Sequence, residues 1–292
     1  MSGFVNGQTG DAPAGSVPND VLIVADKAFR SRLFLGTGKY ASNRIMAEAL
    51  AASGTELVTV SVRYMNVEAP EQESLLDYID RSRYHLLPNT AGATTVKQAV
   101  RMAHLAREVT GTHWIKLEVV GDSRTLWPDT AMTVEATRIL VEDGFVVLPY
   151  TSPDLVAALR LEEAGAAAVM PLGSPIGTGQ GLLDWVGITR IIERVSVPVV
   201  VDAGLGAPSH AAQAMELGAA AVLINTAIAQ ARDPVLMAHA MRQGVEAGRA
   251  AYLAGRMRPR QEASPSSPTE GIIRERAPRA TQVRENTGAE LG

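Results

Sequence analysis

The chain contains no cysteine, and this absence removes several kinds of chemistry at once. Disulfide bridges, cysteine-based zinc sites and cysteine nucleophiles are all excluded. The five histidines show no spacing typical of metal ligands, so the sequence predicts no metal site. Any catalysis must therefore depend on other side chains.

Long apolar runs and a strong charge of either sign are also missing. No run approaches the ~18 residues of a membrane-spanning helix, and residues 1–20 lack the basic and apolar regions of a signal peptide. The net charge of −4 favours neither a nucleic-acid partner nor a membrane surface. We expect a soluble cytoplasmic protein.

Lysine is scarce, because only Lys27, Lys39, Lys97 and Lys116 stand among 27 basic residues. Lys116 lies in HWIKLEVVGD (113–122), a strand-like stretch, and Glu118 follows two positions later. Side chains alternate along a strand, so this spacing predicts that the amine and the carboxylate face the same way.

Apolar strand-like runs alternate with amphipathic helical patterns eight times along the chain. The strands are expected at 32–38, 56–62, 84–90, 114–120, 145–151, 166–173, 197–204 and 220–226, and the helices at 42–54, 73–82, 94–111, 130–144, 154–165, 182–196, 209–218 and 233–255. This alternation predicts an α/β fold with a parallel sheet, and eight units favour a single-domain (β/α)8 TIM barrel. A doubly wound sheet is the alternative, but no strand is followed by G-x-G-x-x-G.

The barrel is expected to occupy residues 21–258, with 21–31 as a hairpin that closes its bottom. Residues 1–20 are expected to form a flexible N-terminal extension. Residues 259–292 contain few apolar side chains, which predicts a mostly flexible C-terminal tail.

Glycine and polar residues stand at the ends of the seventh and eighth expected strands, where barrels of this type often bind phosphate. Gly204 would let backbone N–H groups approach an anion, and Ser209 begins a helix whose free N–H groups attract negative charge. Asn225 and Thr226 end the eighth expected strand. The alternative is an ordinary turn that requires glycine. Gly177, in the glycine-rich stretch 173–181, is a further ligand-binding candidate, unless that stretch is only a lid or linker.

GTGK (36–39) resembles a phosphate-binding loop but lacks its required residues. Leu33 and Tyr40 stand where a P-loop needs glycine and serine or threonine. Lys39 is therefore expected to be a surface residue or a loop contact.

Lys116 is the strongest catalytic candidate. Burial in a barrel would lower its pKa, and a neutral amine can form an imine with a ketone or aldehyde. Glu118 could then move protons, and Asp202 could act as a second acid–base group. The alternative is a buried ion pair without chemistry. These residues predict a Schiff-base enzyme that acts on a phosphorylated sugar.

Seven long motifs, in this order, closely resemble those of bacterial thiazole synthases of thiamine biosynthesis. They are FRSRLFLGTGKY, LLPNTAGA, WIKLEVV, VVLPYTSPD, AAAVMPLGSPIGTGQG, VPVVVDAGLGAPSHAAQAMELGA and AVLINTAIA, within a match over about residues 20–258. Thr151 departs from the cysteine of some members, which the mechanism does not need.

This resemblance implies a (β/α)8 barrel, commonly a homotetramer, that uses no metal or organic cofactor. It implies three substrates: 1-deoxy-D-xylulose 5-phosphate, a sulfur-carrier thiocarboxylate, and dehydroglycine supplied by a tyrosine lyase or a glycine oxidase. Lys116 would form the imine with the sugar, and Glu118 and Asp202 would be the acid–base groups. Substrate contacts would map to Gly177, Ala203, Gly204, Asn225 and Thr226.

Two other functions stay open from the residues alone. A class I aldolase or isomerase could use the same lysine on another sugar phosphate. A barrel that only senses a phosphorylated ligand would keep its response without the Lys116 amine.

Overall fold

The computed structural model describes residues 20–61 and 74–267. The chain divides into two units, Met1–Arg256 and Met257–Gly292. The described part of the second unit, residues 257–267, contains no helix or strand. All the elements below belong to the first unit.

Eight parallel strands form the centre of this unit. In the order in which they pair, they are β10 (Met170–Pro171), β9 (Val146–Thr151), β6 (Trp114–Leu117), β5 (His85–Asn89), β4 (Leu57–Ser61), β3 (Leu33–Gly36), β12 (Ala221–Ile224) and β11 (Val200–Asp202). Parallel bridges from Val169 to Val199 and from Leu172 to Asp202 join the first strand to the last. The sheet therefore closes, which confirms the (β/α)8 barrel rather than an open sheet.

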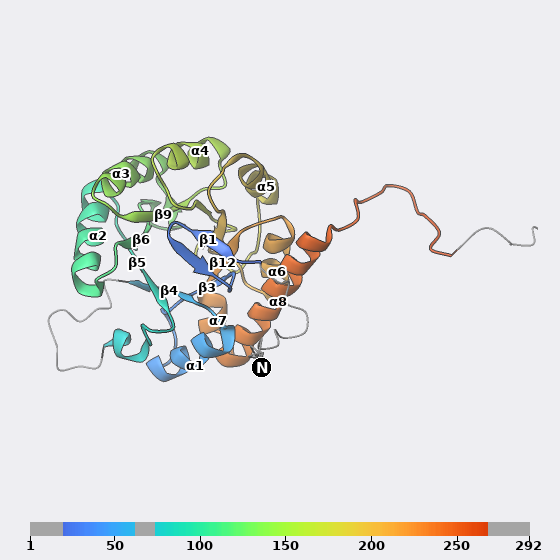
Figure 1. Ribbon diagram of the computed structural model, residues 1–292, viewed down its shortest axis with the longest axis horizontal. Coiled ribbons are helices and arrows are strands. Elements are labelled where there is room, and N and C mark those ends of the chain that lie inside the picture. The colour runs from blue at the N-terminus through green and yellow to red at the C-terminus, as the bar shows by residue number, and fades with distance from the viewer. Residues whose placement is uncertain (1–19, 62–73, 268–292) are drawn as a thin grey trace, which may run out of the picture. The chain divides into compact units, whose positions relative to one another are not determined.

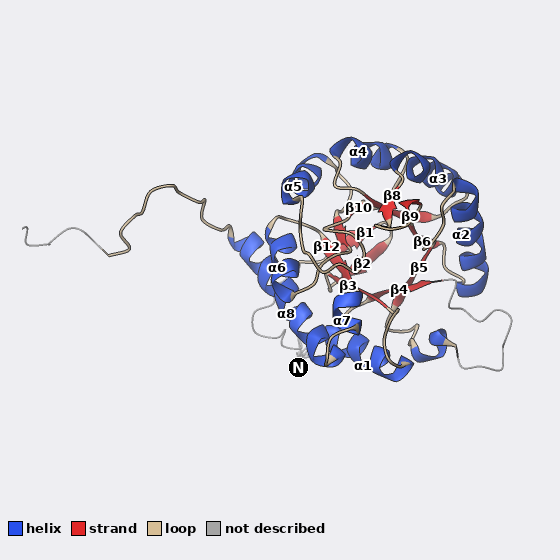
Figure 2. Ribbon diagram, turned by 180° about the vertical axis from the view of Figure 1, so that it is seen from behind, coloured by secondary structure: helices blue, strands red, loops and turns tan. Residues whose placement is uncertain are grey.

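Helices surround the strands, as Figures 1 and 2 show. They are α1 (Asn43–Ser53), α2 (Val96–Thr110), α3 (Thr130–Glu142), α4 (Leu155–Glu163), α5 (Trp185–Arg194), α6 (Pro208–Glu216) and α8 (Pro234–Ala254). Helix α1 begins and ends as its sequence predicts. The Ser42 hydroxyl accepts from the Ile45 N–H, and Gly54 takes a left-handed conformation after the last turn.

The expectation of a helix at 73–82 is wrong for those residues of this range that the structure describes. Only the 3₁₀ helix η2 (Leu75–Tyr78) forms, while residues 62–73 lie outside the described part of the chain. A capping box at Ser74 starts the helix, but at Ile79 the backbone turns extended and the side chain enters the core. A four-residue run makes too few hydrogen bonds to propagate an α-helix.

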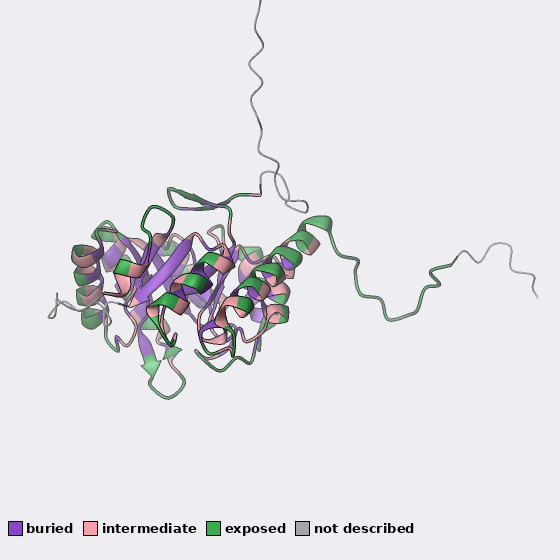
Figure 3. Ribbon diagram, turned by 90° about the horizontal axis from the view of Figure 1, so that it is seen from below, coloured by how far each residue is buried: buried purple, intermediate pink, exposed green. Residues whose placement is uncertain are grey.

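The core has an inner part inside the barrel and outer parts between strands and helices. Its largest inner side chains include Phe34, Leu57, Leu87 and Trp114. Figure 3 shows the buried strands and the exposed outer faces of the helices. The barrel interior is thus packed, and a ligand must bind at one of its ends.

The predicted hairpin closes the N-terminal end of the barrel. It consists of β1 (Leu22–Val24) and β2 (Lys27–Phe29), which pair antiparallel. The Phe29 ring makes edge contacts with Phe34 and Trp114 of the inner core. Apolar burial therefore holds the hairpin across this end.

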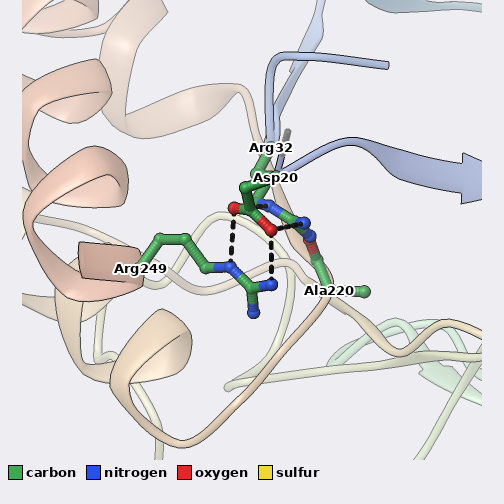
Figure 4. A network of polar contacts seen from close by, with 4 residues as sticks. All are labelled: Asp20, Arg32, Ala220 and Arg249. Atoms are coloured by element: carbon green, nitrogen blue, oxygen red, sulfur yellow. Dashed lines mark hydrogen bonds and ion pairs between the residues drawn. The ribbon is translucent and has the colours of Figure 1, made fainter. Parts of the chain in front are cut away.

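Asp20, the last residue of the expected N-terminal extension, is fixed against the barrel. Its carboxylate accepts two hydrogen bonds from Arg32 and two from Arg249 of α8, and Arg32 also donates to the Ala220 carbonyl (Figure 4). Residues 1–19 lie outside the described part of the chain. Asp20 thus joins the start of the barrel to its last helix.

The sequence did not predict two short elements at the C-terminal ends of the strands. One is a hairpin of β7 (Val120–Asp122) and β8 (Trp127–Pro128), and the other is α7 (Thr226–Ala229). Both insert between a barrel strand and its following helix, so they belong to the loops that build a site in this fold.

Candidate active site

A cavity of about 850 Å³ opens at the C-terminal ends of the strands. Every one of the eight candidate residues lines it: Lys116, Glu118, Gly177, Asp202, Ala203, Gly204, Asn225 and Thr226. They come from β6, β11, the start of α7 and the loops that follow β6, β10, β11 and β12. The fold therefore gathers residues that lie far apart in the chain.

Three ionisable side chains meet in the wall of this cavity. Lys116 is in β6, Glu118 follows that strand directly, and Asp202 ends β11. The Lys116 Nζ lies 2.5 Å from Asp202 Oδ2 and 3.3 Å from Glu118 Oε1. All three side chains are buried. Lys116 and Glu118 do face the same side, as strand alternation predicts.

Burial and ion pairing act in opposite directions on the Lys116 amine. Burial disfavours its charge, but Asp202 and Glu118 together outweigh burial and raise the pKa of Lys116 above its usual range. The expectation of a lowered pKa for Lys116 is wrong. Burial does act in that direction, but the expectation left out the two neighbouring carboxylates, which outweigh it. Lys116 therefore rests as an ammonium ion.

Burial also raises the pKa of both carboxyl groups, although Lys116 opposes this shift. One amine cannot neutralise two buried carboxylates, so the cluster favours keeping a second proton. A proton can pass from Lys116 to Asp202 across their short contact. The cluster can thus supply a neutral amine together with a carboxylic acid, which imine formation requires.

Thr90 holds the backbone that carries Lys116 and Glu118. Its buried hydroxyl accepts from the Glu118 N–H and donates to the Glu118 carbonyl, both at 2.8 Å. The Thr90 N–H also donates to the Lys116 carbonyl. These bonds continue the β5–β6 pairing past the end of β6. They fix the direction in which Glu118 leaves the strand.

The Tyr150 ring lies beside the amine. Its centroid is 5.7 Å from Lys116 Nζ, and its hydroxyl donates to the Leu126 carbonyl. Burial, with Asp202 and Glu118, raises the pKa of the Tyr150 hydroxyl, which therefore stays neutral. The ring limits the space around the amine and favours its cationic form.

The loops after β10, β11 and β12 form another part of the cavity wall. Ala203 and Gly204 both have positive φ angles, +68° and +71°. A Cβ at Gly204 would overlap the Ser174 hydroxyl and lie 2.5 Å from the Ser174 carbonyl oxygen. The close approach of these loops thus requires glycine at this position.

Backbone strain is concentrated around this cavity. Four non-glycine residues in the described part of the chain have positive φ: Ala25, Lys39, Leu126 and Ala203. All except Ala25 line the cavity. Such conformations cost free energy and persist where the surrounding structure enforces them, which is common at functional sites.

Lys39 is a site residue that the sequence interpretation missed. Although exposed, it lines the cavity, near Gly177 and Thr226. The failed P-loop pattern gave no reason to place it there. The only signal in the sequence was that lysine is rare in this chain.

The described residues contain no group of three or more histidine, aspartate and glutamate side chains that could hold a metal ion. None of the helices in the described part is long and apolar enough to cross a membrane.

Several proteins are similar in sequence to this chain over most of its length. Residues 23–268 match the model of a family described as "Thiazole biosynthesis protein ThiG". Thiazole synthase 2 of Syntrophotalea carbinolica is 56% identical over 256 residues, which are 88% of this chain and 99% of that relative. The thiazole synthase of Myxococcus xanthus is 54% identical over 258 residues, 88% and 99% of the two chains.

A solved structure agrees with these sequence matches. The BexX/CysO complex of Amycolatopsis orientalis contains a chain that is 38% identical, with a TM-score of 0.74. The match covers 83% of this chain and 98% of that one. Other barrels, such as a mandelate oxidase at 16% identity and a TM-score of 0.55, share the fold alone.

Proposed function

Because this chain belongs to the ThiG family of thiazole synthases, enzymes that make the thiazole of thiamine, we propose that its reaction passes through an imine on Lys116. The observation that carries this proposal is the buried lysine between two carboxylates, at the end of the barrel where such folds place their active sites. The substrates we propose are 1-deoxy-D-xylulose 5-phosphate, dehydroglycine and the thiocarboxylate of a sulfur carrier.

The first step is attack of the Lys116 amine on the ketone of the sugar. Asp202 takes a proton from the ammonium ion, and the neutral nitrogen adds to the carbonyl carbon. The resulting carbinolamine loses its oxygen as water after that oxygen accepts a proton from a carboxyl group. The pKa of both Asp202 and Glu118 is raised by burial, so a protonated acid is available for this transfer.

Later steps use the same groups. A carboxylate removes a proton from the carbon next to the imine, and tautomerisation moves the carbonyl along the sugar. The thiocarboxylate sulfur adds to this carbonyl, and transfer of the carrier acyl group from sulfur to the carbonyl oxygen lets the carrier leave as its carboxylate. The dehydroglycine nitrogen then replaces the Lys116 amine at the imine carbon, and the sulfur bonds to the dehydroglycine carbon, which closes the ring and frees Lys116. Glu118 is placed for these transfers because Thr90 fixes its backbone.

The sugar phosphate would bind at the loops after β10, β11 and β12. Gly177, Ala203, Gly204, Asn225 and Thr226 line the same cavity as Lys116, so one ligand can contact both regions. The pairing of a glycine-containing loop with a short extra helix after the last strands is frequent at the phosphate sites of this fold.

We propose two protein partners for this barrel. The 38% identical chain was solved in complex with a second protein, CysO, which supports a partner protein here, and we propose a sulfur carrier. The other partner is the enzyme that produces dehydroglycine, a tyrosine lyase or a glycine oxidase.

A homotetramer is also proposed, in the cytoplasm. Large apolar side chains are exposed at the starts of α4 and α5, namely Val156, Leu183, Trp185 and Val186. Subunit interfaces bury surface of this kind.

Trapping the imine tests the proposal directly. The protein is mixed with 1-deoxy-D-xylulose 5-phosphate, reduced with borohydride and analysed by peptide mass spectrometry. We expect a sugar adduct on Lys116 and none in Lys116→Arg, because arginine stays protonated. Lys97→Arg, on the exposed face of α2, should be labelled like the natural protein. An adduct only on another residue would overturn the site.

Sulfur dependence separates this reaction from that of an aldolase or isomerase. Thiazole should form only when the carrier thiocarboxylate and dehydroglycine are both added. Cleavage or isomerisation of the sugar without a sulfur donor would instead favour the class I aldolase or isomerase.

A further inference from the structure

We propose that Lys39 binds the phosphate group of the sugar substrate and sets the preference for phosphorylated over unphosphorylated sugars. This inference rests on the proposed function, because it places a sugar phosphate in the cavity. Its starting point is the charge of the cavity wall. The ionisable residues that line the cavity, among those the structure describes, are Lys39, Lys116, Glu118 and Asp202.

Among these groups, Lys39 is the one whose positive charge is available to a ligand. The Lys116 amine is paired with Asp202 and Glu118, so this cluster has no positive charge to offer a phosphate. By contrast, no described carboxylate forms an ion pair with Lys39. Lys39 is the one cation among the described cavity residues that is free to balance a doubly charged phosphate.

The loop after β3 places Lys39 next to the proposed phosphate residues. A Cβ added at Gly177 would lie 3.5 Å from Lys39 Nζ and 3.9 Å from Thr226 Oγ1. The amine and the Thr226 hydroxyl therefore converge on the same small region. A phosphate there could accept from both, and Gly177 leaves the space open because it has no side chain.

The path of the loop explains how Lys39 reaches this point. A Cβ at Gly36, the last residue of β3, would lie only 2.6 Å from the Asn225 Cβ, so the chain can leave β3 this close to Asn225 only with glycine there. Three residues later, Lys39 has a φ of +68°, which is rare for a lysine. Such a conformation costs free energy and persists where the surrounding structure enforces it, and here the residue that adopts it lines the cavity.

The test measures trapping of two sugars in the full-length protein. Half-saturating concentrations for the Lys116 adduct are determined with 1-deoxy-D-xylulose 5-phosphate and with unphosphorylated 1-deoxy-D-xylulose. In Lys39→Gln, we expect the value for the phosphorylated sugar to rise about tenfold, as for the loss of one charged hydrogen bond. The value for the unphosphorylated sugar should not change.

Two variants serve as controls. Lys97→Gln removes the same charge from an exposed helix position outside the cavity and should change neither value. Lys39→Arg keeps the charge and should retain most of the preference for phosphate. An equal shift for both sugars in Lys39→Gln, or no shift for either, would overturn the proposal.

A second readout separates this inference from the imine mechanism. Titration calorimetry with inorganic phosphate should show weaker binding to Lys39→Gln than to the natural protein and to Lys97→Gln. If borohydride traps no sugar on Lys116 but this difference is present, the imine proposal fails and the role of Lys39 stands. Equal phosphate binding by all three proteins would reject the role of Lys39.

Discussion

The Lys116 Nζ lies 2.5 Å from Asp202 Oδ2, which joins strands β6 and β11 across the barrel mouth. Both side chains are buried, and Glu118, which directly follows β6, lies 3.3 Å from the same amine. One amine and two carboxyl groups thus share a site with little access to water. The hydrogen bonds and packing around this cluster also keep it in place.

Replacing Lys116 with methionine should make stability depend more steeply on pH. Without the amine, the main influence that opposes burial is gone, so the pKa values of Glu118 and Asp202 in the folded protein rise further above their unfolded values. The free energy of unfolding should then fall as pH rises from about 3, where these carboxyl groups are largely protonated in both states, toward neutrality. At pH 7 we expect a loss of about 3–5 kcal/mol, as for a broken buried ion pair.

Urea unfolding at pH 4.5 and 7.5 measures this effect, with Lys97→Met as the exposed control. If the variant loses the same free energy of unfolding at both pH values, the two carboxylates do not carry the uncompensated buried charge that the structure indicates.

Thr90→Val should slow the reaction while the protein still binds its sugar. The valine cannot bond to the Glu118 N–H and carbonyl, so the carboxylate loses its fixed position. We expect kcat to fall about tenfold or more, as misplaced catalytic groups do, with KM for the sugar nearly unchanged. Thr90→Ser keeps the hydroxyl and should restore most of kcat. Steady-state kinetics decides, and a serine variant as slow as the valine variant would point to packing instead.

Gly204→Ala should destabilise the protein far more than Gly111→Ala. Both glycines have φ close to +70°, so alanine is strained equally at each, at a cost of about 1 kcal/mol. A Cβ at Gly111 meets nothing within 4 Å, whereas a Cβ at Gly204 meets the hydroxyl and carbonyl of Ser174. We expect Gly204→Ala to cost roughly 3 kcal/mol or more, as overpacking a buried site does. Urea unfolding of both variants is the measurement, and equal losses would contradict the clash.

Asp20→Asn should weaken the attachment of the N-terminal segment to α8. Hydrogen bonds from Arg249 and Arg32 lower the pKa of the Asp20 carboxyl to about 2. The pKa of Asp20 is therefore lower in the folded protein than the value of 3.8 expected in the unfolded chain. Ionised Asp20 stabilises the fold above pH 3.8, and this contribution is lost as pH falls toward about 2. At pH 7 we expect a loss of about 1–2 kcal/mol, allowing for partial solvent exposure.

The matched control is Asp26→Asn, because Asp26 is exposed and pairs only loosely with Lys27 at 3.8 Å. In thermal unfolding between pH 2 and 7, the melting temperatures of the natural protein and of Asp20→Asn should converge as the pH approaches 2. Curves that stay parallel over this range would contradict the effect of the two arginines.

Much of the barrel could be predicted because each unit carries its own local signals. The Ser42 cap and the Gly54 terminus set α1, and apolar runs such as AVLI in β12 indicate buried parallel strands. Where such signals are weak, prediction failed, as in the expected helix at 73–82. The β7–β8 hairpin was also missed, since its short paired segments carry no clear alternation.

In the candidate site, too, local patterns could be predicted and contacts between remote segments could not. Alternation along one strand brought Lys116 and Glu118 together, and the position of Asp202 at a strand end suggested the third member. The pKa of Lys116 was misjudged, since it depends on distances to carboxylates from two chain segments that no local pattern contains. Lys39 was missed for a related reason: its place beside Gly177 and Thr226 depends on how segments remote in the chain pack together.

The sequence by itself determined the eight-unit barrel, the residue types available for chemistry and the end of the barrel where they gather. These features follow from periodicity and strand polarity, which act over a few residues at a time. Only the tertiary structure decided the charge state of Lys116 and the neighbours of Lys39. Electrostatic free energy depends on distance and burial, and both are set when segments remote in the chain pack together.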